Sequence, residues 1–217
     1  MTKSGWEFLP DRAIWWPSES TLIVSDLHLG KAGHFRRHGI AVPNAVNANT
    51  LERLTALVER HKPGRLLVLG DLFHSEENHE WLEFRAWLLA LHAQPWFREF
   101  RLVEGNHDIL PPSAFEGMEV QRCTVWRFGD WVFAHDPNDL TALPEGTVGG
   151  AGHLHPAISM VGKGRQSLKL PCWWYDAGRR RLVVPTFGTF TGSVSVQPKK
   201  GDACWVTTGE TVLPVPV

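Results

Sequence analysis

Five short clusters along the sequence combine side chains that bind divalent metal ions in proteins. They are Asp26-Leu27-His28, Gly70-Asp71-Leu72-Phe73-His74, Gly105-Asn106-His107-Asp108, His135, and Gly152-His153-Leu154-His155. Asp-x-His and His-x-His each place two side chains on the same side of an extended segment, because side chains alternate along it. Carboxylate and amide oxygens mixed with imidazoles suit Mn, Fe or Zn better than Ca or Mg. Such a set fits a two-metal hydrolysis, in which one carboxylate bridges the ions and both ions hold phosphoryl oxygens.

Each cluster has a simpler interpretation when it is taken alone. An Asp-x-His after a strand is commonly a loop or a helix cap, and Gly-Asp is commonly a turn. His135 follows an apolar run and is compatible with a hydrogen-bonded core histidine. Turn chemistry does not readily explain five such clusters in this order, so the whole set favours a metal site.

The elements that must position these clusters are short apolar runs and helical patterns. Residues 21–25 (TLIVS), 65–69 (RLLVL) and 100–103 (FRLV) stand before the first three clusters and predict strands buried on both faces. Helical periodicity covers residues 46–61 and 79–92, with Asn44 as a candidate cap of the first helix. This order predicts a parallel sheet, in which ligands bind at the carboxyl ends of the strands.

The second half of the chain is richer in strands. A hairpin is predicted over residues 126–134 with its turn at Gly129-Asp130, and strands over 158–161, 167–174, 182–184 and 204–207. The segment before Gly152 is rich in glycine and is interpreted as a turn. We therefore expect an α/β fold of two packed sheets with helices outside. Residues 1–217 should form a single domain, because no linker divides them.

The composition narrows the class of protein. With 217 residues, 43% of them hydrophobic, the chain can bury a sizeable core. A net charge of −1 excludes a generally basic protein that coats nucleic acid, but not a nucleic-acid substrate. The three scattered cysteines argue against a disulfide framework, and no apolar stretch is long enough to span a membrane. We expect a cytoplasmic protein without membrane association.

The order of the five clusters over residues 26–155 resembles the calcineurin-like metallophosphoesterase superfamily. The resemblance implies a four-layer α/β/β/α sandwich of two mixed sheets flanked by helices. It also implies two divalent metal ions, most simply Mn²⁺ with Fe or Zn as alternatives. By position, the first ion would be held by Asp26, His28, Asp71 and His155, and the second by Asp71, Asn106, His135 and His153. His107 would assist the leaving group without binding metal, and Asp108 would help to hold its loop. Every ligand position is filled, which favours an enzyme over an inactive scaffold.

The position three residues after Asp71 differs between branches of the superfamily. Protein phosphatases usually carry an Asp there that pairs with the motif histidine. This chain has His74, which resembles the DNA double-strand-break repair nucleases, where this histidine assists the phosphodiester reaction. A surface histidine on a loop is the alternative interpretation.

A closer resemblance covers nearly the whole chain. The motifs are His28-Leu29-Gly30-Lys31, Phe35-Arg36, Gly39-Ile40, Gly152-His153-Leu154-His155-Pro156-Ala157, Leu170-Pro171-Cys172-Trp173-Trp174 and the tail 182–192 (LVVPTFGTFTG). They are similar to the bacterial ligase-associated DNA-damage-response endonuclease family called PdeM, although that family tends to have Cys-Phe at Cys172-Trp173. The likeness implies association with an ATP-dependent DNA ligase, a helicase and an exonuclease.

Basic residues just beyond the first cluster are candidate substrate contacts. Lys31, Arg36 and Arg37 could bind phosphates next to the scissile one, which would add affinity without reading sequence. A solvated loop explains them equally well.

Three functions remain open on the sequence alone. The first is a phosphodiesterase, specifically an endonuclease that acts on nucleic acid, with DNA as a candidate substrate, in DNA repair. The second is a phosphomonoesterase acting on nucleotides or phosphoproteins. The third is a weakly catalytic subunit of a repair complex that binds partners through its tryptophan-rich surface.

Overall fold

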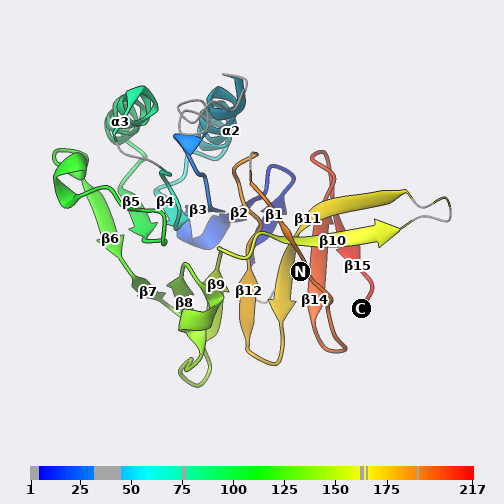
Figure 1. Ribbon diagram of the computed structural model, residues 1–217. Coiled ribbons are helices and arrows are strands. Elements are labelled where there is room, and N and C mark those ends of the chain that lie inside the picture. Colours follow the sequence, from blue (N-terminus) through cyan, green and yellow to red (C-terminus); the bar gives the residue numbers. More distant parts are fainter. Residues whose placement is uncertain (1–4, 32–44, 75–76, 162–163, 165, 190) are drawn as a thin grey trace.

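The first sheet carries most of the elements that position the clusters (Figure 1). The structure is a computed structural model that describes residues 5–31, 45–74, 77–161, 164, 166–189 and 191–217. The sheet contains, side by side, β1 (Glu7–Leu9), β2 (Ala13–Trp16), β3 (Thr21–Ser25), β4 (Arg65–Leu69), β5 (Glu99–Val103) and β6 (Val120–Cys123). Strands β3 to β6 are parallel, and β1 and β2 add an antiparallel edge. Helices α2 (Ala45–His61) and α3 (His79–His92) lie in the crossovers between β3, β4 and β5.

Helix α3 shows how the sequence specifies these crossovers. Asn78 caps its first turn, accepting a hydrogen bond from the Trp81 N–H at 3.2 Å. Its buried residues recur at helical spacing and form one apolar stripe against the sheet: Trp81, Phe84, Leu88 and Leu91. The predicted cap of α2, Asn44, lies outside the described residues.

The parallel register brings the first two clusters together. Ser25 pairs with Leu69, the last residue of β4, and Leu69 with Val103, the last residue of β5. The loops continue this alignment past the strands, because the His28 N–H donates to the Asp71 carbonyl at 2.8 Å. Residues that follow these strands therefore lie along one edge of the sheet.

The second sheet is built from the rest of the chain. Its strands are β7 (Val125–Phe128), β8 (Trp131–Ala134), β9 (Val148–Ala151), β10 (Pro156–Val161), β11 (Ser167–Asp176), β12 (Arg181–Val183), β13 (Val194–Ser195), β14 (Ala203–Thr207) and β15 (Val212–Val215). The order is β13-β10-β11-β12-β9-β8-β7, with β14 paired to β11 and β15 to β14.

The interpretation of the segment before Gly152 as a turn is wrong. Val148–Ala151 forms β9, which lies between β8 and β12 and runs parallel to both. A Cβ on Gly150 would lie 2.7 Å from Cδ1 of Phe133, far below an ordinary contact. This glycine therefore makes room for an aromatic ring inside the sandwich and does not mark a turn.

Apolar layers hold the elements together, and the predicted α/β sandwich of two mixed sheets is confirmed. The first layer packs α2 and α3 on one face of the first sheet, and the second fills the space between the sheets. On the outer face of the second sheet, Leu140 of the short helix η3 (Pro137–Leu140) packs on Val132, Ala134 and Ala151. Among the described residues, the fourth layer there is thus η3 and not a long helix. The described part of the chain has no helix long and apolar enough to cross a membrane.

The other short helices lie at strand connections and leave this layering unchanged. They are η1 (Pro17–Glu19), between β2 and β3, and η2 (Pro112–Phe115), between β5 and β6. The sequence has two adjacent tryptophan pairs, Trp15-Trp16 and Trp173-Trp174, and one member of each, Trp16 and Trp173, is buried between the two sheets. The Trp173 ring is fully buried and serves packing, whereas Trp16 is 7% exposed and also lines a pocket between the sheets.

Candidate metal centre

Two groups of potential metal ligands lie where strands of both sheets end. The first group is Asp26, His28 and His155, and the second is Asp71, His135 and His153. Within each group, one ligand atom of every residue lies within 4.8 Å of the others. Segments far apart in the sequence therefore converge, as the clusters predicted.

In the first group, imidazole nitrogens face carboxylate oxygens. Nε2 of His155 lies 3.2 Å from Oδ1 of Asp26 and 3.5 Å from Nε2 of His28. Nε2 of His28 is also 3.7 Å from Oδ2 of Asp71. One oxygen of Asp71 therefore faces this group.

The other oxygen of Asp71 faces the second group. Its Oδ1 lies 3.5 Å from Nε2 of His135. The same His135 nitrogen is 3.2 Å from Oδ1 of Asn106 and 3.0 Å from Nδ1 of His153. The structure thus brings all seven predicted metal ligands together and places Asp71 between the two groups, as a bridging carboxylate requires. The assignment of each ligand to one ion stays a prediction.

The chemistry of these donors fits divalent cations. Nδ1–H of His135 donates to the Leu69 carbonyl at 3.0 Å, and Nδ1–H of His155 to the Gly192 carbonyl at 2.9 Å. Each bond fixes the tautomer that leaves the Nε2 lone pair directed at the carboxylates. Carboxylate oxygens that face these nitrogens so closely need positive charge beside them, which a proton on an imidazole provides in the metal-free protein and a metal ion in each group would provide in its place.

The electrostatics of the first group agree with this. Burial lowers the pKa of His28 to about 3, so its imidazole is neutral at pH 7 and can bind metal. Its Nδ1 has no hydrogen-bond partner among the described residues. Burial alone would raise the pKa of Asp26, but hydrogen bonding to His155 and the charges of His155 and His135 outweigh burial and lower it. Asp26 is thus an anionic ligand.

The backbone at the site is held in an uncommon conformation. Five of the seven predicted ligands have positive φ, a region that residues other than glycine rarely adopt: Asp26 (52°), His28 (48°), Asp71 (49°), His153 (65°) and His155 (46°). Each such residue costs on the order of 1–3 kcal/mol and persists only where its surroundings enforce it. This clustering is typical of functional sites.

Glycines of the motifs allow the ligands to approach closely. A Cβ on Gly105 would lie 2.6 Å from the Asp71 nitrogen and would also meet its Oδ1. A Cβ on Gly152 would lie 2.6 Å from Oδ2 of Asp26 and would collide with the Ser25 hydroxyl. The glycines therefore stand where a side chain would displace a ligand.

The tail after β12 supports the first group, a role that the sequence did not reveal. Its Thr186 hydroxyl and Gly188 N–H both donate to the Asp26 carbonyl, at 2.9 and 3.1 Å. Further along, the Gly192 carbonyl accepts from His155. The tail thus holds two ligands of the first group, Asp26 and His155. The available signal was a run of Thr, Phe and Gly directly after an apolar strand.

Comparison with known proteins identifies the family. The calcineurin-like phosphoesterase family matches residues 20–192. The chain belongs to this family. The structure is similar to the nuclease MPE of Pseudomonas putida, with 27% identity, a TM-score of 0.74, and coverage of 95% of this chain and 93% of that one. The YfcE phosphoesterase of E. coli is 15% identical with a TM-score of 0.43, over 90% of this chain and 97% of that one. A search among curated proteins finds no match.

As a calcineurin-like phosphoesterase, the chain is a metal-dependent hydrolase of phosphate esters with a dinuclear centre. Divalent ions bound in the two groups would supply Lewis-acid stabilisation of phosphoryl oxygens and would increase the acidity of a water molecule. Asp71 would bind both ions, and Asp26, Asn106 and the imidazoles would complete the two sets of ligands. The side chains predicted to assist the leaving oxygen are the histidines beside the ligands.

His74 and His107 lie next to each other at the edge of the first group. Their ring centroids are 4.0 Å apart, and they lie 5.3 and 5.7 Å from the ring of His28. The His107 N–H also donates to Oδ1 of Asp71 at 3.0 Å. The backbone of His107 therefore supports the bridging carboxylate while its imidazole lies beside His74. Their catalytic roles stay predictions.

Asp108 holds loops together. Its Oδ1 accepts hydrogen bonds from the N–H groups of Leu72 at 2.8 Å and Phe73 at 3.3 Å, and its Oδ2 accepts from Gly105 at 2.7 Å. Burial, aided by the charge of Asp71, raises the pKa of Asp108 to about 6 against the effect of these bonds. This carboxylate joins the loops after β4 and β5, which carry Asp71 and Asn106.

The predicted substrate contacts are only partly described. Lys31 is partly buried, and although burial lowers its pKa, the charges of Asp71 and Asp26 act in the opposite direction. The two carboxylates thus favour its charged form, and its role as a substrate contact stays a prediction. Arg36 and Arg37 lie outside the described residues.

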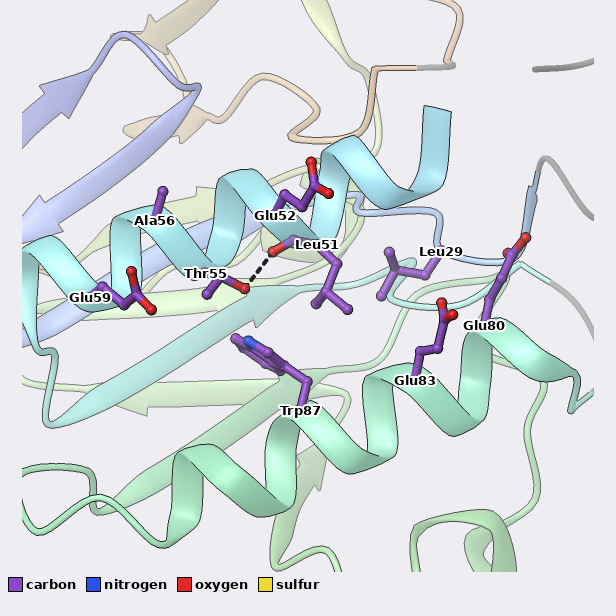
Figure 2. Close-up of a pocket in the computed structure, with 9 residues that line it drawn as sticks. All are labelled: Leu29, Leu51, Glu52, Thr55, Ala56, Glu59, Glu80, Glu83 and Trp87. Carbon is purple, nitrogen blue, oxygen red and sulfur yellow. Dashed lines mark hydrogen bonds between the residues drawn. The ribbon is translucent and has the colours of Figure 1, made fainter. Parts of the chain in front are cut away.

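A groove between α2 and α3 limits where a polyanion can lie. It is lined by four carboxylates, with Leu51 and Trp87 between them: Glu52, Glu59, Glu80 and Glu83. Figure 2 shows these carboxylates on the two facing helices. Because like charges repel, phosphates should avoid this groove although Leu29, one of its lining residues, follows the first metal motif.

Proposed function

We propose that this chain is a phosphodiesterase, and specifically an endonuclease acting on nucleic acid with two Mn²⁺ ions. The observation that carries the proposal is the contact between His74 and His107 beside the first group of ligands. Departure of a nucleotide oxygen requires a proton, and an imidazole is the side chain best suited to give one near neutral pH. A second imidazole at His74 adds no negative charge, whereas the Asp of the phosphatase branch would repel a polyanion.

Two further observations support a nucleic-acid substrate. The similarity to the Pseudomonas putida nuclease MPE extends over 95% of this chain. Lys31 directly follows the first metal motif, and Asp26 and Asp71 favour its charged form, which supports a contact with phosphates that flank the scissile one. The acidic groove between α2 and α3 would direct the strand away from those helices.

A comparison of two synthetic esters tests the diesterase assignment. Under Mn²⁺, kcat/KM for bis(p-nitrophenyl) phosphate should exceed that for p-nitrophenyl phosphate, and supercoiled plasmid should be nicked. The His74→Asp variant should move the ratio toward the monoester by tenfold or more. His79→Asp is the matched control, because His79 lies on the exposed start of α3 and forms an ion pair with Glu83, at 3.1 Å. A monoester preference of the unchanged protein would overturn the assignment in favour of a phosphomonoesterase.

The metal and the biological setting are proposals as well. Mixed carboxylate, amide and imidazole donors support Mn²⁺, with Fe or Zn as alternatives. Metal analysis of the purified protein, with reconstitution by each ion, tests this.

The PdeM resemblance supports a role in DNA repair beside an ATP-dependent DNA ligase, a helicase and an exonuclease. The three free cysteines support a cytoplasmic setting. Unchanged survival after DNA damage in cells that lack the chain would contradict the repair role.

A further inference from the structure

An aromatic pocket lies between the two sheets, away from the metal centre. Its volume is about 650 Å³, within the range of roughly 300–1,000 Å³ usual for ligand sites. Its aromatic lining comes from both sheets and from distant parts of the chain: Trp16, Trp131, Tyr175 and Trp205. The catalytic residues described above do not take part in it.

The pocket and the metal centre lie at opposite ends of the same strands. Trp131 is the first residue of β8, and His135 directly follows the last. Val148, which lines the pocket, is the first residue of β9, and Gly152 directly follows the last. Four residues of strand span about 13 Å, so one small substrate cannot occupy both sites.

The charged groups of the pocket are all negative. Glu19 and Asp130 line it, and its lining contains no Lys, Arg or His. Neither carboxylate forms an ion pair with another described residue. Aromatic faces attract cations, and carboxylates beside them strengthen the attraction and repel phosphates.

The aromatic walls are held by packing and need little ordering when a ligand binds. Trp131 stacks on Trp6 with ring centroids 3.8 Å apart, and Trp16 packs edge-on to Trp131 at 6.4 Å. Trp205 contacts Phe8, with centroids 4.9 Å apart. A preformed site lowers the entropic cost of binding.

We propose that this pocket binds an arginine side chain presented by a partner polypeptide. A guanidinium is planar, stacks on aromatic rings and forms forked hydrogen bonds with carboxylates, so it matches both features of the lining. A nucleobase would also stack, but its phosphate would meet Glu19 and Asp130. The pocket therefore couples a partner protein to the enzyme at the end away from catalysis, and it does not depend on which ester the enzyme cleaves.

Binding of a short peptide tests the proposal directly. The probe is acetyl-Gly-Arg-Gly-amide, compared with the same peptide carrying citrulline, the neutral isostere of arginine, and with adenosine monophosphate. Binding is followed on the metal-loaded protein through the NMR signals of the tryptophan indole N–H groups, with Trp205→Phe used to assign one of them. The arginine peptide should shift these signals saturably and bind at least fivefold more tightly than the citrulline peptide.

Paired variants then locate the site. Glu19→Gln with Asp130→Asn should weaken the arginine peptide at least fivefold and leave ester turnover unchanged. Glu52→Gln with Glu59→Gln, the same charge change on α2, should leave binding as it is. Equal binding of the arginine and citrulline peptides, tighter binding of adenosine monophosphate, no saturable shift below about 10 mM, or unaltered binding by the first double variant would each overturn the proposal.

Discussion

Replacing Gly105 by alanine should disable the metal centre through a single methyl group. The added Cβ would lie 2.6 Å from the Asp71 nitrogen, and an ordinary contact begins near 3.4 Å. One side must therefore move by about 0.8 Å. The Gly105 N–H donates to the Asp108 carboxylate, and the His107 N–H, two residues further on, donates to the Asp71 carboxylate, so neither loop moves alone. Displacement of catalytic groups by about 1 Å costs on the order of 100-fold in rate.

The assay measures both the cause and the effect. Turnover of bis(p-nitrophenyl) phosphate under saturating Mn²⁺ should fall about 100-fold in Gly105→Ala. Metal content should fall below that of the unchanged protein, because Asp71 faces both groups. Gly178→Ala is the matched control, since its Cβ would lie at an ordinary 3.5 Å from Asp176 Oδ1.

A clear result would refute this reasoning. If Gly105→Ala retained turnover within threefold of the unchanged protein together with its full metal content, close approach of this backbone to Asp71 would not matter. The ligand geometry derived above would then be wrong at its centre.

The remaining predictions address the bridging ligand, the leaving group, the loop carboxylate and pH. Asp71→Asn should lose bound metal and nearly all turnover. His107→Ala should keep its metal and lose turnover by roughly 100-fold, which is the size of a general acid's contribution. Metal analysis and kinetics on both variants check these outcomes. Asp108→Asn should lower the free energy of unfolding by about 1–3 kcal/mol in urea, because an amide NH₂ would face backbone donors; an unchanged midpoint would exclude this role. In metal-free protein, burial keeps the pKa of His28 at about 3, so between pH 7 and pH 5 only the unfolded chain takes up a proton there. The free energy of unfolding should therefore fall by about 2 kcal/mol between pH 7 and pH 5. His28→Gln should remove this part of the pH dependence. An identical pH slope in the variant would contradict the low pKa of His28.

Elements with a strong local pattern were predictable from the sequence. The strands at 21–25 and 65–69 and the helix at 79–92 occur at the predicted bounds, and α2 begins one residue before the predicted range. Each carries a continuous apolar run or a helical stripe, which local sequence specifies without help from distant residues. The hairpin at Gly129-Asp130 also forms where it was predicted.

Elements whose pattern depends on distant partners were missed. β1 and β2 are short and pair as an antiparallel edge on a parallel sheet, so nothing local distinguishes them from loop. β9 has two central glycines because Phe133 and Leu140 occupy the space where their side chains would be. A glycine required by a ring more than ten residues away looks like a turn in the sequence.

The same distinction applies to the metal centre. The convergence of residue types that could bind metal was predictable because they follow strands in a parallel sheet, and their order carries the resemblance to the family. The backbone carbonyls that orient His135 and His155 come from Leu69 and Gly192, and a carbonyl leaves no mark in the sequence. Contacts of this kind determine which imidazole nitrogen faces the ion, so they had to be seen in the structure.

The architecture explains why one sandwich can hold a strained metal centre and still be stable. The metal-ligand residues with positive φ lie in loops, whereas the strands that lead to them are buried on both faces in continuous apolar layers. The cost of each strained residue, on the order of 1–3 kcal/mol, is therefore carried by packing elsewhere, since apolar burial contributes about 25 cal/mol per Å². At the opposite end of β8 and β9 the same strands need no strain, and there the lining is formed by tryptophan side chains fixed by core contacts. Strand ends thus provide two sites of different chemistry, one that requires cations and one whose carboxylates and aromatic rings attract them.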